Sequence, residues 1–142
     1  MNDIDRLPHR PPMRLPEEIV ELIPGVRCRA RRHTRVGDFY FQGHFPGVPV
    51  VPASILVELI AQTGGLAAGT SVSSSSRPIQ LRVAAFGPCK FPGAAGAGVT
   101  LDVDARVVGH LGGLFKIQGD VRVDGTLVAT GDVTLALVAL PE

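Results

Sequence analysis

The sequence predicts one α+β domain spanning residues 1–142, in which a single long helix packs against an antiparallel sheet. Two observations support this prediction. Residues 52–69 form a largely apolar stretch, as expected of a helix that is buried on nearly every face. Residues 79–140 then read as a series of strands, of which Val99–Val107 alternates most cleanly between apolar and polar side chains. No internal repeat and no second domain are visible in the sequence.

The composition argues against several classes of protein. A chain of 142 residues with 45% hydrophobic and 19% charged residues is typical of a globular domain with a real core. The net charge of +1 does not favour nucleic-acid binding through bulk charge. The sequence has no run of about 18 apolar residues, and its first residues lack a signal-peptide pattern. We therefore expect a cytoplasmic protein without a membrane span. The two cysteines, Cys28 and Cys89, match neither a disulfide framework nor a metal-binding spacing.

Residues 15–36 read as a β-hairpin. Pro24-Gly25 suits the central positions of a type II turn between strands over Glu18–Ile23 and Val26–Val36. Glu17-Glu18 could instead open a short helix, and the choice of a strand there rests on the family resemblance given below.

The second half of the chain contains the remaining strands. We expect strands over Ile79–Phe86, Gly119–Val123 and Thr126–Leu140, with residues 87–93 turning the chain after the first of them. Asp124-Gly125 is a strong signal for a two-residue hairpin turn.

A loop precedes the central helix. Two glycines and three prolines between Gly43 and Pro52 exclude regular structure there. Pro52 suits the first helical turn, because its missing N–H would have no partner at that position. We expect the helix to end at Gly64-Gly65 or at Gly69.

Glu58 is the anomaly of this helix, because every other residue from Ile55 to Ala61 is apolar. A carboxylate in such a place is unfavourable unless it is paired or faces a solvated cavity. Ser54 and Gln62 lie one turn away on the same face and would form a polar stripe with it. His44 lies in the preceding loop. Glu58 could be a structural carboxylate bonded to local donors beside a solvent-exposed His44, or the two could form a functional pair.

Four segments of the chain resemble the FabZ type of (3R)-hydroxyacyl-[acyl-carrier-protein] dehydratase. They are Leu7–Pro12, Phe41–Gly47, Pro49–Pro52 and Glu58–Gln62. The resemblance runs from Leu7 to about Leu140 and is most specific in the middle block. It implies a hot-dog fold, in which a curved sheet wraps around one helix.

The resemblance also implies the catalytic pair. In this family the His of the G-H-F-P motif and the Glu of the following helix are catalytic and lie 14 positions apart, as do His44 and Glu58 here (58 − 44 = 14). We assign His44 as the general base, since neutral imidazole suits proton abstraction near neutral pH. Glu58 is assigned to protonate the leaving hydroxyl or to position a water, because burial should raise the pKa of its carboxyl. Gln62 could orient that carboxyl through its amide.

The substrate carbonyl needs fixed hydrogen-bond donors, and the start of the helix offers free backbone N–H groups at Ala53 and Ser54. The family usually has Gly followed by an aliphatic residue at these positions. Other departures are Pro11, Pro16-Glu17 and Pro92-Gly93. We therefore expect a divergent member from a fatty-acid or polyketide pathway.

His9 belongs to the resembling P-H-R segment. From the sequence it is interpreted as a surface or packing residue, since nothing places it near the chemistry. The arginine row Arg27, Arg29 and Arg31 allows two interpretations: the solvated outer face of a sheet, or an electropositive landing area for an acidic carrier protein.

The resemblance implies an acyl carrier protein as partner and a homodimer or a trimer of dimers, in which the active site takes His from one subunit and Glu from the other. It implies no metal and no organic cofactor. Two other functions stay open: a hot-dog acyl thioesterase, and a non-catalytic partner subunit of a dehydratase heteromer.

Overall fold

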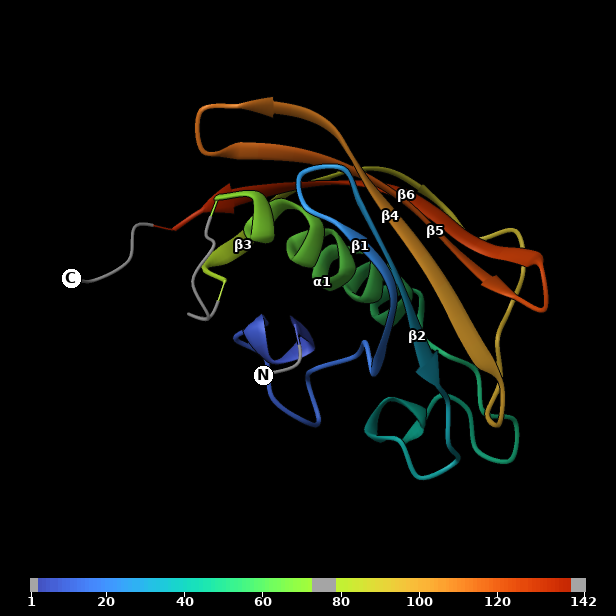
Figure 1. Cartoon of the computed structure of the whole chain (residues 1–142). Helices are drawn as coiled ribbons and strands as arrows, with labels where there is room; N and C mark the ends of the chain where they lie inside the picture. Colours follow the sequence, from blue (N-terminus) through green and yellow to red (C-terminus); the bar gives the residue numbers. More distant parts are fainter. Residues whose placement is uncertain (1–2, 73–78, 139–142) are drawn as a thin grey trace.

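The structure is a computed structural model that describes residues 3–72 and 79–138. One long helix lies along the concave side of a curved six-stranded sheet (Figure 1). The predicted α+β class is therefore confirmed. The elements are η1 (Asp3–Arg6), β1 (Glu18–Ile23), β2 (Arg27–His33), η2 (Phe39–Phe41), α1 (Ala53–Val72), β3 (Leu81–Lys90), β4 (Thr100–Leu111), β5 (Leu114–Val123) and β6 (Thr126–Leu137).

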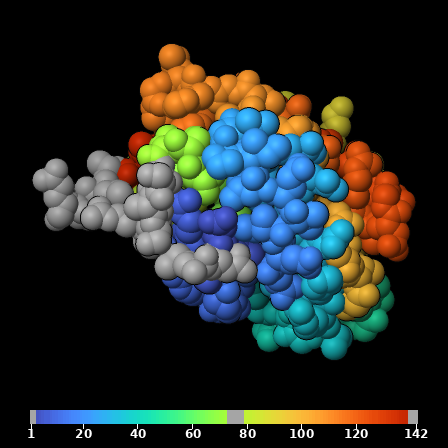
Figure 2. All heavy atoms as spheres, in the orientation of Figure 1, coloured from blue at the N-terminus to red at the C-terminus, as the bar shows by residue number. Residues whose placement is uncertain are grey.

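The strand order in the sheet is β1-β2-β4-β5-β6-β3, and every neighbouring pair is antiparallel. β1 and β3 are therefore the two edge strands. α1 packs mainly across β4, β5, β6 and β2. The N-terminal segment lies on the other side of α1 (Figure 1). It also packs against β1, and Figure 2 shows the two segments in contact at the surface. The helix is thus covered by the sheet on one side and partly by the start of the chain on the other.

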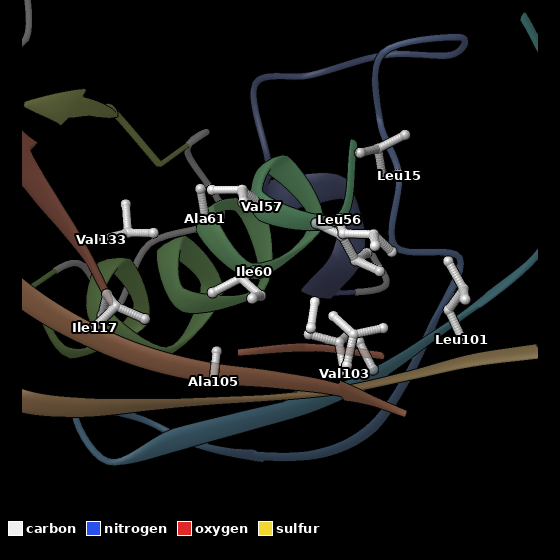
Figure 3. Close-up of a cluster of buried hydrophobic side chains, with 14 of the residues drawn as sticks. Leu15, Leu56, Val57, Ile60, Ala61, Leu101, Val103, Ala105, Ile117 and Val133 are labelled. Atoms are coloured by element: carbon white, nitrogen blue, oxygen red, sulfur yellow. The ribbon is translucent and has the colours of Figure 1, made fainter. Parts of the chain in front are cut away.

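The core forms where α1 meets the centre of the sheet. Figure 3 shows Ile60 pointing from the helix toward the strands that carry Ala105 and Ile117, and all three side chains are fully buried. On β5, buried residues alternate with exposed ones, as the pleat of a half-buried strand requires. Gly119 of β5 faces Ile60 and leaves room for it, since a Cβ there would lie 2.4 Å from Ile60 Cγ2.

Both predicted hairpin turns are confirmed. Pro24-Gly25 joins β1 to β2, and Asp124-Gly125 joins β5 to β6. Asp124 and Gly125 have φ angles of 49° and 80°, the left-handed pair that a type I′ hairpin turn requires. The strand choice at Glu18 is also correct.

The predicted ends of the central helix are wrong. The helix runs through Gly64, Gly65 and Gly69 and ends at Val72. A Cβ at Gly64 would lie 2.6 Å from Ile117 and one at Gly69 would lie 2.2 Å from Ile79, so these two glycines allow close packing rather than ending the helix. At the other end Pro52 precedes the helix, and its carbonyl accepts hydrogen bonds from the N–H groups of Ile55 and Leu56.

The end predicted for the third strand is also wrong. β3 continues through Gly87 and Pro88 to Lys90, whereas the sequence predicted a turn over residues 87–93. Its register with β6 shifts between Phe86 and Cys89, so Gly87 and Pro88 lie in an irregular part of an edge strand, where proline is tolerated. The last predicted strand ends at Leu137, and Leu140 lies outside the described residues.

Judged only by its length and its composition, α1 could cross a membrane, although the sequence has no unbroken run of about 18 apolar residues. In the structure, 72% of its most apolar window is buried inside the fold. A helix covered in this way occupies the position of a core helix.

The arginine row faces aspartates of β4. Arg27 pairs with Asp104, and Arg31 Nε lies 2.9 Å from Asp102 Oδ1. The hydrogen bond and the charge of Asp104 raise the pKa of Arg27 above its ordinary value. Because Arg27 and Arg31 are paired with aspartates of the neighbouring strand, the structure supports the interpretation as a solvated outer face. Arg29 is exposed, and the landing-area alternative stays a prediction.

The two adjacent glycines of α1 provide a test of helix-to-sheet packing. We expect Gly64→Ala to lose about 1–3 kcal/mol through overpacking against Ile117, offset in part by the better helix propensity of alanine. Gly65→Ala, whose Cβ would meet nothing within 4 Å, should gain about 0.5–1 kcal/mol from propensity alone. Urea unfolding of both variants measures the difference. Equal stabilities would contradict the packing described for Gly64.

Candidate active site

Glu58 faces a cavity of about 200 Å³ between α1, the N-terminal segment and β3. The polar side chains in its lining are His9, Glu58, Gln62 and Arg82, and the rest of the lining is apolar or glycine. The Glu58 side chain is 28% exposed, so the carboxylate is half-buried at the edge of an apolar space. This arrangement resolves the anomaly in the sequence, because the carboxylate borders a cavity and is not enclosed in the core.

Gln62 holds the Glu58 carboxylate. Its amide nitrogen donates to Glu58 Oε1 at 3.0 Å and to the Met13 carbonyl at 2.8 Å, and its amide oxygen accepts from Leu15 N–H at 2.9 Å. The Gln62 side chain is only 2% exposed, and its three hydrogen bonds fix the orientation of its amide. This geometry fits the orienting role assigned to Gln62, which stays a prediction. Ser54, the third member of the expected stripe, is exposed, and within the described chain no hydrogen bond joins it to Glu58.

His44 lies in the loop before α1 and is half-buried. Its Nδ1 lies 3.0 Å from the Val50 carbonyl, which can only accept, so Nδ1 carries the proton. In the neutral ring this leaves the lone pair of Nε2 available to accept a proton, as a general base requires. The ring stacks on Phe45 at 4.3 Å. Among the described residues that line the Glu58 cavity, His44 is absent, and its meeting with Glu58 across a dimer stays a prediction.

Ala53 and Ser54 form the exposed first turn of α1. The Pro52 carbonyl takes the N–H groups of Ile55 and Leu56, whereas those of Ala53 and Ser54 have no acceptor in the described chain. Such free N–H groups, at the positive end of the helix dipole, suit an oxyanion. Ala53 does not have the positive φ angle that only glycine adopts readily, so its replacement of the usual glycine leaves this donor in place.

The sequence predicts a surface or packing residue at His9, but the structure places its side chain beside Glu58. Its Nε2 lies 3.8 Å from Glu58 Oε1, and the ring lines the same cavity. Sequence periodicity could not have found this contact, because His9 lies outside any regular element. The one available signal was its place in a segment that resembles the dehydratases.

A second polar cluster anchors the loop that leads to His44. Arg32 Nη2 lies 3.1 Å from Asp38 Oδ2, and the Tyr40 hydroxyl donates to the same oxygen at 2.6 Å. Burial would by itself raise the Asp38 pKa, but hydrogen bonds from Tyr40, Arg35 N–H and Arg32 lower it below its ordinary value. Burial, together with the bond to Asp38, raises the Tyr40 pKa to about 12. The charges of Arg32 and Asp38 are therefore paired with each other, and the cluster holds η2 against β2.

A family model described as "FabA-like domain" matches residues 7–132. The chain belongs to the FabA-like family. It is 33% identical over 131 residues to a protein named 3-hydroxyacyl-[acyl-carrier-protein] dehydratase FabZ from Nitratidesulfovibrio vulgaris (strain DP4), covering 92% of this chain and 85% of that one. The protein of the same name from Myxococcus xanthus (strain DK1622) is 33% identical over 136 residues, covering 95% of this chain and 88% of that one.

Solved structures show the same fold at low sequence identity. "The Dehydratase Heterocomplex ApeI:P from Xenorhabdus doucetiae" aligns over 98% of this chain and 92% of its own with a TM-score of 0.83 and 16% identity. The structure of smu.793 from Streptococcus mutans UA159, bound to acetyl CoA, aligns over 88% and 90% of the two chains with a TM-score of 0.68 and 15% identity. The predicted family and the predicted hot-dog fold are therefore both confirmed.

Tyr40 is the one tyrosine of the chain, which has no tryptophan, so its ionisation can be followed directly by ultraviolet absorbance. We expect it to titrate at about 12 in the folded protein and near 10 in denaturant. Because folding raises this pKa, its contribution to stability is complete below about pH 10 and is lost as the pH rises toward 12. Circular dichroism in parallel establishes that the fold persists. A native midpoint near 10 would contradict the buried cluster.

Proposed function

We propose that this protein dehydrates (3R)-3-hydroxyacyl thioesters, carried on an acyl carrier protein, to trans-2-enoyl thioesters. The observation that carries the proposal is Glu58: the one charged residue of α1, held by a buried amide, at the edge of a mostly apolar cavity. Membership of the FabA-like family and two relatives named as FabZ dehydratases support the same reaction.

The proposed reaction uses three groups of the chain. His44 Nε2 removes the proton from the carbon next to the thioester carbonyl. The N–H groups of Ala53 and Ser54 stabilise the negative charge that moves onto the carbonyl oxygen. The carbon–oxygen bond at C3 then breaks, and the hydroxyl takes a proton from Glu58 and leaves as water. Before the next turnover His44 gives up its proton and Glu58 regains one, either by transfer between the two groups or by exchange of both with solvent. This chemistry needs neither a metal nor an organic cofactor.

A homodimer formed along β3 would complete this site. β3 is an edge strand, so one side of its backbone is open to a further strand, and its Phe86 is 57% exposed. Leu81 and Val83 of the same strand line the Glu58 cavity, so a second chain added at β3 would lie beside that cavity. Its His44 loop could then supply the base that the cavity lacks. A trimer of such dimers would keep this pairing at β3. A heteromer, the kind of assembly for which the Xenorhabdus structure is named, would instead place a different chain at this edge.

The wider context follows from the proposed reaction. We place the enzyme in the cytoplasm and in fatty-acid or polyketide synthesis, where carrier-bound 3-hydroxyacyl groups are formed by reduction of 3-oxoacyl groups. Ala53 and Ser54, which replace the usual Gly and aliphatic pair, lie where the thioester would bind. They would therefore affect substrate range more than the reaction itself.

Two substitutions test the catalytic pair. His44→Ala and Glu58→Gln should each lower turnover by at least about 10²-fold, since general acid–base groups contribute about 10²–10⁴-fold. Glu58→Gln keeps the shape of the side chain and removes its proton. Ser54→Ala is the matched control and should change turnover much less, because the donor proposed there is the main-chain N–H.

The assay follows enoyl absorbance and free thiol together, on carrier-bound and small-molecule 3-hydroxyacyl thioesters of several chain lengths. Enoyl formation that depends on both His44 and Glu58 is the expected result. Thiol release without enoyl formation would instead identify a thioesterase. If the wild-type protein gives neither enoyl formation nor thiol release, the proposal is overturned in favour of a non-catalytic partner subunit.

A further inference from the structure

The contact between His9 and Glu58 is used by no step of the proposed reaction. His9 Nε2 lies 3.8 Å from Glu58 Oε1, and both side chains line the cavity beside α1. We infer that His9 is a positioning residue, which holds the Glu58 carboxylate in the orientation that the reaction needs. This inference rests on the proposed function, since it assigns a role toward the proposed acid.

The arrangement around the carboxylate shows what this positioning achieves. Gln62 Nε2 and His9 Nε2 both approach Oε1, at 3.0 Å and 3.8 Å. In the part of the chain that the structure describes, Oε2 has no hydrogen-bond partner. Gln62 donates a hydrogen bond to Oε1, and the His9 ring approaches the same oxygen from just beyond hydrogen-bond distance. Both side chains hold the carboxyl group from the Oε1 side and leave Oε2 to face the reacting atoms.

The surroundings of the His9 ring favour one tautomer of the neutral imidazole. Its Nδ1 is shielded from solvent and has no hydrogen-bond partner among the described residues, whereas Nε2 faces the Glu58 carboxylate. The ring proton therefore belongs on Nε2, because an N–H there points toward an acceptor and an N–H on Nδ1 would have none. His9 is therefore set up to donate toward the carboxylate.

The backbone around His9 is fixed from both ends. Arg10 donates from Nη1 to the carbonyls of Leu7 and His9, at 2.6 Å and 2.9 Å, and Leu7 is buried. Gln62 binds the backbone of Met13 and Leu15 further along. The N-terminal segment thus reaches Glu58 twice, once through Gln62 and once through His9. A residue that only fills space would need neither an N–H donor nor a ring nitrogen that faces Glu58.

Three variants of His9 separate positioning from packing. Gln is long enough to place its amide N–H near the former Nε2, whereas Leu fills similar space without a donor. We expect His9→Leu to lower kcat by about 10-fold or more at nearly unchanged KM, and His9→Gln to recover most of that loss. His9→Asn, whose amide is too short to reach Glu58, should resemble His9→Leu. His110→Gln, near the exposed end of β4, is the matched control and should behave as wild type.

The decisive measurement combines His9→Leu with Glu58→Gln. If His9 acts through Glu58, the double variant should be no slower than Glu58→Gln alone, while thermal unfolding shows all variants folded. Losses that multiply would overturn the inference, as would a fully active His9→Leu enzyme. A Glu58→Gln enzyme with wild-type turnover would instead remove the proposed function, so the two failures are distinguishable.

Discussion

The hydrogen bond from Gln62 to Glu58 is the interaction on which the site depends. It stabilises the one charged residue of a largely apolar helix, and the donor is a side chain that is itself buried. The same amide binds the backbone at Met13 and Leu15, so the N-terminal segment and the helix are fixed relative to each other. Loss of this one side chain would leave the buried N–H of Leu15 unpaired, at a cost of about 1–3 kcal/mol, and would release the carboxylate.

The sheet supplies the second constraint. α1 can lie close to the strands because glycines replace larger residues at the contact, in the helix at Gly64 and in β5 at Gly119. This close packing buries one side of the helix against the sheet. The opposite side, which carries Glu58 and Gln62, therefore faces the N-terminal segment and β3. The loop before α1 is held independently by Arg32, Asp38 and Tyr40. The positions of the carboxylate and of His44 are therefore fixed by different parts of the chain.

Much of this could be predicted from the sequence, and the failures have physical causes. The helix, the two hairpins and the polar residues Glu58 and Gln62 follow from local pattern. The end of the helix could not be predicted in this way, because Gly64 and Gly69 make room for Ile117 and Ile79 and do not end the helix. His9 was misplaced for the same reason: a residue outside regular structure has no periodicity, and its contact with Glu58 exists only in the folded molecule.

The central claim is that His44 of one chain acts with Glu58 of another, and a mixed dimer tests it most directly. His44→Ala and Glu58→Gln chains, carrying different affinity tags, are co-expressed, and the heterodimer is purified through both tags. One of its two sites would then combine an intact His44 with an intact Glu58, so it should recover about half of the wild-type activity, whereas each variant alone stays nearly inactive. An inactive but folded heterodimer would contradict the account, because it would place both groups in a site formed by a single chain.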